Sequence, residues 1–227
     1  NHRLGLVLGE PGTGKSLLLK MFENDCRRQG YAVASVNLFG LSSREFYWQL
    51  SSQLGAAVRV EDDLLRLFRQ LSDRVIENRL QGVSTVVLVD DVHQAGPDLL
   101  AQLVRLVQLD AATAEPLTIV LAANEPQADR LGEQLHELVD LRIDLEAWDE
   151  LDTIGYMQLA LVEAGCERPL FDDESLSEIH LLADGVPRRV NRLADHALLV
   201  GSRDAPEIID TATIRAAHDA LNPPARQ

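Results

Sequence analysis

The chain has 227 residues, of which 46% are hydrophobic and 25% charged, so we expect a globular protein with one large domain or a core domain and a smaller one. Its formal net charge of −15 disfavours direct DNA binding, because a broad DNA-binding face needs clustered Lys and Arg to neutralise phosphates. No apolar run approaches the length of a transmembrane helix. Cys26 and Cys166 lack a metal-binding spacing, and we expect two buried free thiols in a reducing compartment.

A phosphate-binding pattern follows the first predicted strand. Apolar residues 4–8 predict a buried strand, and residues 16–28 have the pattern of a helix. Between them the sequence matches G-x-x-x-x-G-K-[S/T], the Walker A pattern, in the strand–loop–helix context that this motif requires. The residues that we assign to nucleotide binding are Gly9, Glu10, Pro11, Gly12, Thr13, Gly14, Lys15, Ser16 and Leu17.

The chemistry of this loop suits a nucleoside triphosphate. Its glycines allow backbone conformations that are closed to other residues, so that successive N–H groups can point inward. Those groups and the N-terminus of the following helix are expected to hold the phosphates. Lys15 is expected to reach the β- and γ-phosphates, and the Ser16 hydroxyl to bind Mg²⁺. ATP and Mg²⁺ are therefore the predicted ligands.

Strands and helices continue to alternate after this loop. We expect strands over residues 31–37, 83–89, 117–123 and 141–145, the last of them partly exposed. We expect helices over residues 42–54, 62–80, from 97 onward and near 127–138. Such alternation predicts an α/β fold, in which a parallel sheet is covered by helices on both faces in three α/β/α layers.

Polar side chains end two of the predicted strands. Asp90 and Asp91 follow a buried apolar run, as in a Walker B segment, and ligands of open α/β sheets bind beyond the carboxyl ends of the strands. We expect Asp90 to hold Mg²⁺, directly or through water, and Asp91 to activate the attacking water. Asn124 ends the next strand and is expected to position that water. The alternative is that these residues only start polar loops. His93 could pair with Asp91, but we expect a solvated loop histidine.

The pattern changes near residues 146–149, after which no further strand is visible. We expect helices over residues 150–165, 172–183, 187–200 and 211–221. The predicted domains are a nucleotide-binding core over 1–147, a helical domain over 148–221 and a tail or linker over 222–227. Trp48 and Trp148 are expected to be packing residues.

Arg188 has a functional interpretation within the helical domain. Pro187 is expected to be the first residue of a helix, which places Arg188 where the helix dipole disfavours a cation. A nearby anion such as a γ-phosphate would explain that position. The alternative is a surface arginine that pairs with Asp184 or another acid.

Taken together, these motifs resemble the AAA+ ATPases, in particular the branch of the general secretion pathway A type (ExeA/GspA-like), whose transposition-helper relatives resemble TniB. The resemblance runs nearly end to end. The segments that carry it are residues 9–16, 36–38, 42–45, 90–94, 156, 164–165 and 185–191. The last segment is also similar to the sensor-2 helix of RuvB-like motors. The resemblance implies a P-loop NTPase core followed by a small all-helical AAA+ lid, with Asn124 as sensor 1 and Arg188 as sensor 2.

Three positions depart from the family pattern. Asp91 stands where the family usually has Glu, so a bound water would sit farther from the shorter carboxylate. Residues 124–126 read Asn-Glu-Pro where the family usually has Gly-Gln-Pro. Residues 134–138 lack the arginine that is the family's candidate finger, for which Arg130 and Arg142 are the nearest substitutes. Activation of hydrolysis by a neighbouring subunit is therefore in doubt.

The resemblance implies a Mg²⁺-dependent ATPase that couples ATP hydrolysis to remodelling or assembling a protein partner, and the departure at Asp91 suggests low turnover. A component of the secretion pathway, membrane or cell envelope would be such a partner, and a homo-oligomer is expected. The alternative is a slow or non-hydrolysing nucleotide-dependent switch that regulates assembly or DNA transposition. A P-loop kinase is weaker, because the helical domain has no role in it. We expect a cytoplasmic domain of a longer parent protein, which a membrane segment outside this sequence could anchor.

Overall fold

The computed structural model describes residues 4–110, 117–166, 168–204 and 208–222. The chain divides into two compact units. The first comprises Asn1–Pro11 and Lys15–Leu145, and the second comprises Gly12–Gly14 and Glu146–Gln227. Within the described ranges, none of the helices combines the length and the apolar character needed to cross a membrane.

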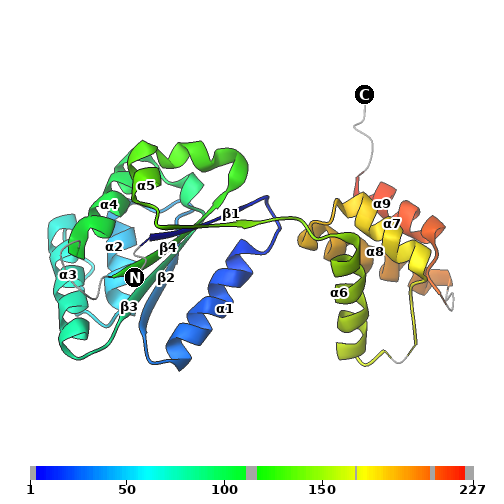
Figure 1. Cartoon of the computed structure of the whole chain (residues 1–227), viewed down its shortest axis with the longest axis horizontal. Helices are drawn as coiled ribbons and strands as arrows, with labels where there is room; N and C mark the ends of the chain where they lie inside the picture. The colour runs from blue at the N-terminus through cyan, green and yellow to red at the C-terminus, as the bar shows by residue number, and fades with distance from the viewer. Residues whose placement is uncertain (1–3, 111–116, 167, 205–207, 223–227) are drawn as a thin grey trace. The chain divides into compact units, whose positions relative to one another are not determined.

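The first unit is built on a parallel sheet with the strand order β2-β3-β4-β1-β5. Its strands are β1 (Leu4–Gly9), β2 (Ala32–Asn37), β3 (Thr85–Asp90), β4 (Thr118–Asn124) and β5 (Leu141–Leu145). The register pairs Gly9 with Asn124 and Asn37 with Asp90. Because all the strands run in the same direction, these residues end their strands at one edge of the sheet (Figure 1).

Helices cover both faces of the sheet, which confirms the three-layer α/β/α prediction (Figure 1). Helix α1 (Lys15–Arg28) packs on one face, and the other face carries α2 (Ser43–Gln53), α3 (Leu64–Leu80), α4 (Pro97–Val107) and α5 (Glu133–Leu138). Successive strand residues point to opposite faces. Accordingly, Leu6 and Leu8 belong to the larger core, whereas Val7 packs with Leu19 of α1.

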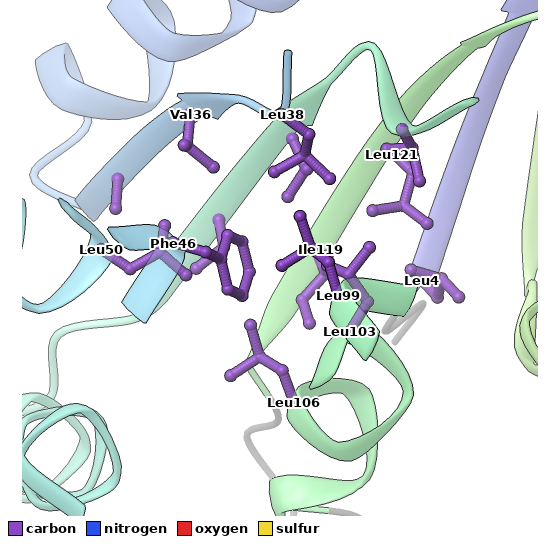
Figure 2. Close-up of a cluster of buried hydrophobic side chains, with 14 of the residues drawn as sticks. Leu4, Val36, Leu38, Phe46, Leu50, Leu99, Leu103, Leu106, Ile119 and Leu121 are labelled. Carbon is purple, nitrogen blue, oxygen red and sulfur yellow. The ribbon is translucent and has the colours of Figure 1, made fainter. Parts of the chain in front are cut away.

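The larger core is mainly aliphatic, because only 4% of the residues are aromatic. Figure 2 shows Ile119 of β4 among leucines of α4, with Phe46 of α2 beside them. Each large aliphatic side chain buried in this way contributes roughly 1.5–3 kcal/mol. Trp48 packs against the same core, as expected for a packing residue.

Two local features differ from the sequence predictions. Instead of one helix near residues 127–138, the chain forms a 3₁₀ helix, η3 (Glu125–Leu131), and then α5. Gly132 separates them with a φ of 77°, a conformation that cannot continue a right-handed helix. Of the two free thiols, Cys26 is buried as predicted, whereas Cys166 is only half-buried.

Among the described residues from 150 onward, the regular structure of the second unit is helical, apart from an isolated bridge between Phe171 and Ile209. Its helices are α6 (Glu150–Glu163), α7 (Asp173–Ala183), α8 (Pro187–Asp204) and α9 (Thr211–Leu221). An aspartate side chain caps the N-terminus of three of them, namely Asp149, Asp172 and Asp210. These caps are possible because the acidic sequence places Asp immediately before each helix.

The start of α8 is tied to Trp148. The Trp148 N–H donates to the Gly185 carbonyl oxygen at 2.9 Å, and the Gly185 N–H donates to that of His180 at 3.2 Å. Gly185 has a φ of 65°, and a Cβ at this position would overlap the Trp148 carbonyl oxygen. The Trp148 ring lies 4.7 Å from the ring of Tyr156, which confirms its packing role. Glycine is therefore required at the turn that leads into α8.

Replacing Gly185 with Ala should destabilise the helical unit by at least about 1–3 kcal/mol, because the left-handed backbone becomes strained and the new Cβ has no room. The matched control is Gly155→Ala in α6, where a Cβ meets no atom within 4 Å. It should leave stability unchanged or raise it by up to about 1 kcal/mol. Urea unfolding followed by Trp148 fluorescence, in a Trp48→Phe background, reports on this unit. Equal stability of the two variants would contradict the packing described.

Candidate functional site

Two of the three glycines in the segment between β1 and α1 have the backbone that the sequence predicted, whereas Gly9 ends β1 without a positive φ. Gly12 and Gly14 have φ values of 102° and 106°, which residues with a Cβ rarely adopt. Helix α1 begins at Lys15, directly after this loop, and the sequence of its first turn contains no acidic residue. A helix N-terminus of this kind presents N–H groups and a partial positive charge, which together favour an anion.

The ammonium group of Lys15 is held at the beginning of the same loop. The Lys15 side chain is buried, with 6% of the residue exposed. Its Nζ donates to the carbonyl oxygens of Gly9 at 2.9 Å and Glu10 at 2.8 Å. Ser16, the next residue, is exposed in the first turn of α1. A cation and a hydroxyl group are thus placed beside the glycine-rich backbone.

The end of β3 carries two carboxylates in different surroundings. Asp90 accepts a hydrogen bond from the Asp91 N–H at 2.9 Å. Asp91 has a left-handed backbone, with a φ of 53°, and its Oδ2 accepts from the Asn37 amide at 2.7 Å. Asn37 also accepts from the Phe39 N–H at 2.9 Å. Asn37 therefore connects Asp91 to the loop that follows β2.

Asn37 was not among the site residues predicted from the sequence. Its signal was available, since it ends a predicted strand in the same way as Asp90 and Asn124 do. Its bond to Asp91 depends on the pairing of β2 with β3, which no local pattern shows.

His93 is the residue whose predicted environment was wrong. It lies in a 3₁₀ helix, η1 (Val92–Gln94), and only 3% of it is exposed, so it is not a solvated loop histidine. Its partner is Asn124 rather than Asp91. The backbone N–H of Asn124 donates to Nδ1 at 3.3 Å, and the Asn124 side-chain amide lies 2.9 Å from Nε2.

Charged groups from three segments act on His93. Burial lowers the pKa of His93 below its ordinary value, and the cations Lys15 and Arg130 act in the same direction. Asp91 and Asp90 oppose this effect, because their negative charges favour the imidazolium. These opposing charges leave the pKa of the His93 ring below its ordinary value.

The three predicted arginines are exposed. Arg188 is exposed in the first turn of α8, and the Asp184 carboxylate bonds to Arg189 instead, at 2.6 Å. Asp184, the acid considered as a partner of Arg188, is therefore bonded to the neighbouring arginine. Arg142 makes its hydrogen bonds to Asp144, at 2.9 and 3.0 Å, on the exposed strand β5. Arg130 is exposed in η3.

A parallel sheet of this order, with a G-x-x-x-x-G-K-S loop between β1 and α1, is the fold of the P-loop NTPases. The chain belongs to the AAA domain family, whose model matches residues 1–144. It is 27% identical over 198 residues to "General secretion pathway protein A" of Aeromonas hydrophila, an alignment that covers 86% of this chain and 36% of that protein. The chain therefore spans about a third of that relative's length.

Solved structures share the fold at low sequence identity. Cdc6p from Pyrobaculum aerophilum matches with a TM-score of 0.75 and 14% identity, over 94% of this chain and 59% of that one. The Aeropyrum pernix ORC2 protein, solved as ADPNP–ADP complexes, matches with a TM-score of 0.72 and 13% identity, over 100% of this chain and 63% of that one. The Thermotoga maritima RuvB Holliday junction branch migration motor matches with a TM-score of 0.66 and 14% identity, over 97% of this chain and 62% of that one.

Replacing Asn37 with Ala should speed hydrogen exchange at the Phe39 amide roughly two- to tenfold, because that N–H loses its acceptor. The Leu38 amide, which donates to the main-chain oxygen of Asp90 at 3.0 Å, should exchange as before. Asn37→Asp is the matched control, since it keeps an acceptor for Phe39. Exchange followed by NMR tests this geometry, and an unchanged Phe39 rate in Asn37→Ala would refute it.

Proposed function

We propose that this chain is a Mg²⁺-dependent ATPase of the AAA+ type. The observation that carries the proposal is that three neighbouring parallel strands end in Asp90, in Asn124 and in Gly9, with Asp91 directly after Asp90. The Gly9 carbonyl oxygen holds the Lys15 ammonium group at 2.9 Å. One edge of the sheet thereby presents a cation for phosphates, a carboxylate for a metal and a carboxylate for water activation. Membership of the AAA domain family supports the same activity.

The residues present fit a nucleotide with Mg²⁺. The positive φ values of Gly12 and Gly14 suit a backbone that turns its N–H groups toward phosphates, and Lys15 supplies the charge. Ser16 and Asp90 are the proposed metal ligands. Among the described residues, no group of three or more His, Cys, Asp and Glu side chains forms a metal site. Mg²⁺ would therefore take its other oxygen ligands from the phosphates and water, as is usual for this ion.

Hydrolysis is assigned to three side chains of the same edge. Asp91 is the proposed general base, and its hydrogen bond from Asn37 fixes one carboxylate oxygen. Asn124 is the proposed group that positions the attacking water beside the γ-phosphate. Aspartate is one methylene shorter than glutamate, so we expect turnover to be slow.

We assign residues 1–147 to the nucleotide-binding core, 148–221 to a helical lid and 222–227 to a tail or linker. Arg188 is the proposed γ-phosphate sensor of the lid, because a guanidinium can bond an oxygen that ADP lacks. The pairing of Asp184 with Arg189 supports this role, since it removes one competing partner of Arg188.

The proposed partner is a protein in a cytoplasmic assembly, with ATP turnover coupled to remodelling or assembly. Similarity to General secretion pathway protein A supports a role connected with secretion or the cell envelope. The second candidate is a slow or non-hydrolysing switch in a homo-oligomer, which would regulate assembly or transposition. One observation favours it: Arg142, a substitute for the family's finger, is already bonded to Asp144.

Lys15→Met should weaken binding of Mg·ATP at least about tenfold, because the charge-assisted bonds to the phosphates are lost while the buried aliphatic stem is kept. Lys20→Met is the matched control, as it removes the same charge from an exposed position of α1. Isothermal titration calorimetry measures both. The assignment fails if the two variants bind ATP equally well.

Asp91→Asn should lower the rate of phosphate release roughly 10²–10⁴-fold, because an amide cannot accept the proton of water. ATP affinity should change little, since asparagine tolerates the left-handed backbone and can still accept from Asn37. Asp98→Asn, at an exposed position in the first turn of α4, is the matched control. A wild-type rate in Asp91→Asn would exclude Asp91 as the base.

Arg188→Ala should abolish the nucleotide-dependent movement of the helical domain. Fluorescent probes on the two domains should report a different distance with a non-hydrolysable ATP analogue than with ADP, and the difference should vanish in the variant. Arg192→Ala, which removes another exposed arginine of α8, should behave like the wild type. If the change persists in Arg188→Ala, this residue is not the sensor.

A further inference from the structure

Both ring nitrogens of the buried His93 contact a single residue, Asn124. Nδ1 lies 3.3 Å from the backbone nitrogen of Asn124, and Nε2 lies 2.9 Å from its side-chain amide. His93 comes from the segment that follows β3, whereas Asn124 ends β4. The histidine is thus a bridge between two neighbouring strand ends, and its hydrogen bonds fix the side chain that faces the proposed chemistry.

The two contacts determine which nitrogen carries the proton. A neutral imidazole has one donor and one acceptor, and a backbone N–H can only donate. Nδ1 must therefore accept from Asn124, and Nε2 must carry the hydrogen. Burial lowers the pKa of His93, which keeps the ring neutral as this arrangement requires.

We infer that His93 is a positioning residue that turns the side-chain amide of Asn124 so that its oxygen, Oδ1, accepts from Nε2–H. The opposite orientation would place the amide's NH₂ group against another donor, which gives no hydrogen bond. The amide nitrogen and oxygen exchange places by a half-turn of the group, with almost no change in shape. The heavy-atom separation of 2.9 Å is therefore kept, but the bond runs from histidine to asparagine.

Gln127 in η3 fits the same arrangement. Its side-chain amide lies 3.3 Å from the Asn124 amide atom that contacts His93. There Asn124 Nδ2 faces Gln127 Oε1, so once that position holds the Asn124 oxygen, the Gln127 amide makes the same half-turn and donates through its own NH₂ group. The oxygen then accepts two hydrogen bonds, one from His93 and one from Gln127, which matches its two lone pairs.

The consequence for function lies in the other half of the Asn124 amide. Because Oδ1 faces His93 and Gln127, the NH₂ group lies on the opposite side of the Asn124 amide, where it offers two N–H donors. Donors suit a phosphate oxygen or the oxygen of an attacking water, whereas an exposed Oδ1 would repel an anion. This step rests on the proposed ATPase function, and it makes His93 responsible for the polarity of Asn124.

The first test is independent of ATP. In the full chain labelled with ¹⁵N-histidine, long-range N–H correlations distinguish the Nε2–H from the Nδ1–H tautomer, and the His93 signals are identified by their absence in His93→Gln. We expect the Nε2–H tautomer. Finding Nδ1–H, or a doubly protonated ring at pH 7.5, would overturn the inference even if the protein hydrolyses ATP.

The second test separates positioning from packing. His93→Leu removes both hydrogen bonds and should lower phosphate release at least about tenfold, with ATP affinity within about threefold. His93→Gln can still donate to Asn124, so it should recover much of the lost rate. Val92→Ala loosens the buried η1 segment without touching these bonds and should change the rate by less than about threefold.

The results have distinct meanings. A wild-type rate in His93→Leu would overturn the inference, as would an equal loss in Val92→Ala without rescue by His93→Gln. Absence of phosphate release in the wild type would remove the proposed function, and the tautomer would then decide the inference alone.

Discussion

The constraint on which the structure depends is that parallel strands end at one edge of their sheet. The order β2-β3-β4-β1-β5 places β4 between the strand that leads into the glycine loop and the strand that ends in Asp90. Register then pairs Gly9 with Asn124, and Asn37 with Asp90. The glycine loop that starts at Gly9 and the side chains of Asn124, Asn37 and Asp90 thus lie at the same edge of the sheet. The roles proposed for the residues at the strand ends follow from this alignment.

The sequence predicted much of this arrangement, because its signals are local. The loop with Lys15, the acids Asp90 and Asp91, and Asn124 all follow apolar strands, and the rule that ligands bind at strand ends selects them. The alternation of strands and helices predicted the α/β layers. The burial of His93 and the bond of Asn37 to Asp91 escaped prediction, because both depend on contacts between segments far apart in the sequence.

The helical unit illustrates the same limit. Its helices were predicted from apolar patterns at helical spacing, and the structure adds that Asp149, Asp172 and Asp210 cap three of them. The sequence could not predict that Asp184 pairs with Arg189 and not with Arg188, because neighbouring arginines have the same sequence signal. The chain spans 36% of the length of its secretion-pathway relative, so a partner's binding site need not lie within these residues.

The central claim is that one sheet edge forms the nucleotide site, and backbone amide NMR of the labelled chain tests it most directly. Titration with Mg·ATP should shift the amides of residues 9–16 together with those of Asn37, Asp91, His93 and Asn124. The amides at the opposite ends of the strands, such as Thr85 and Thr118, should stay in place. Shifts confined to the helical unit, or no saturable shift at all, would contradict the account.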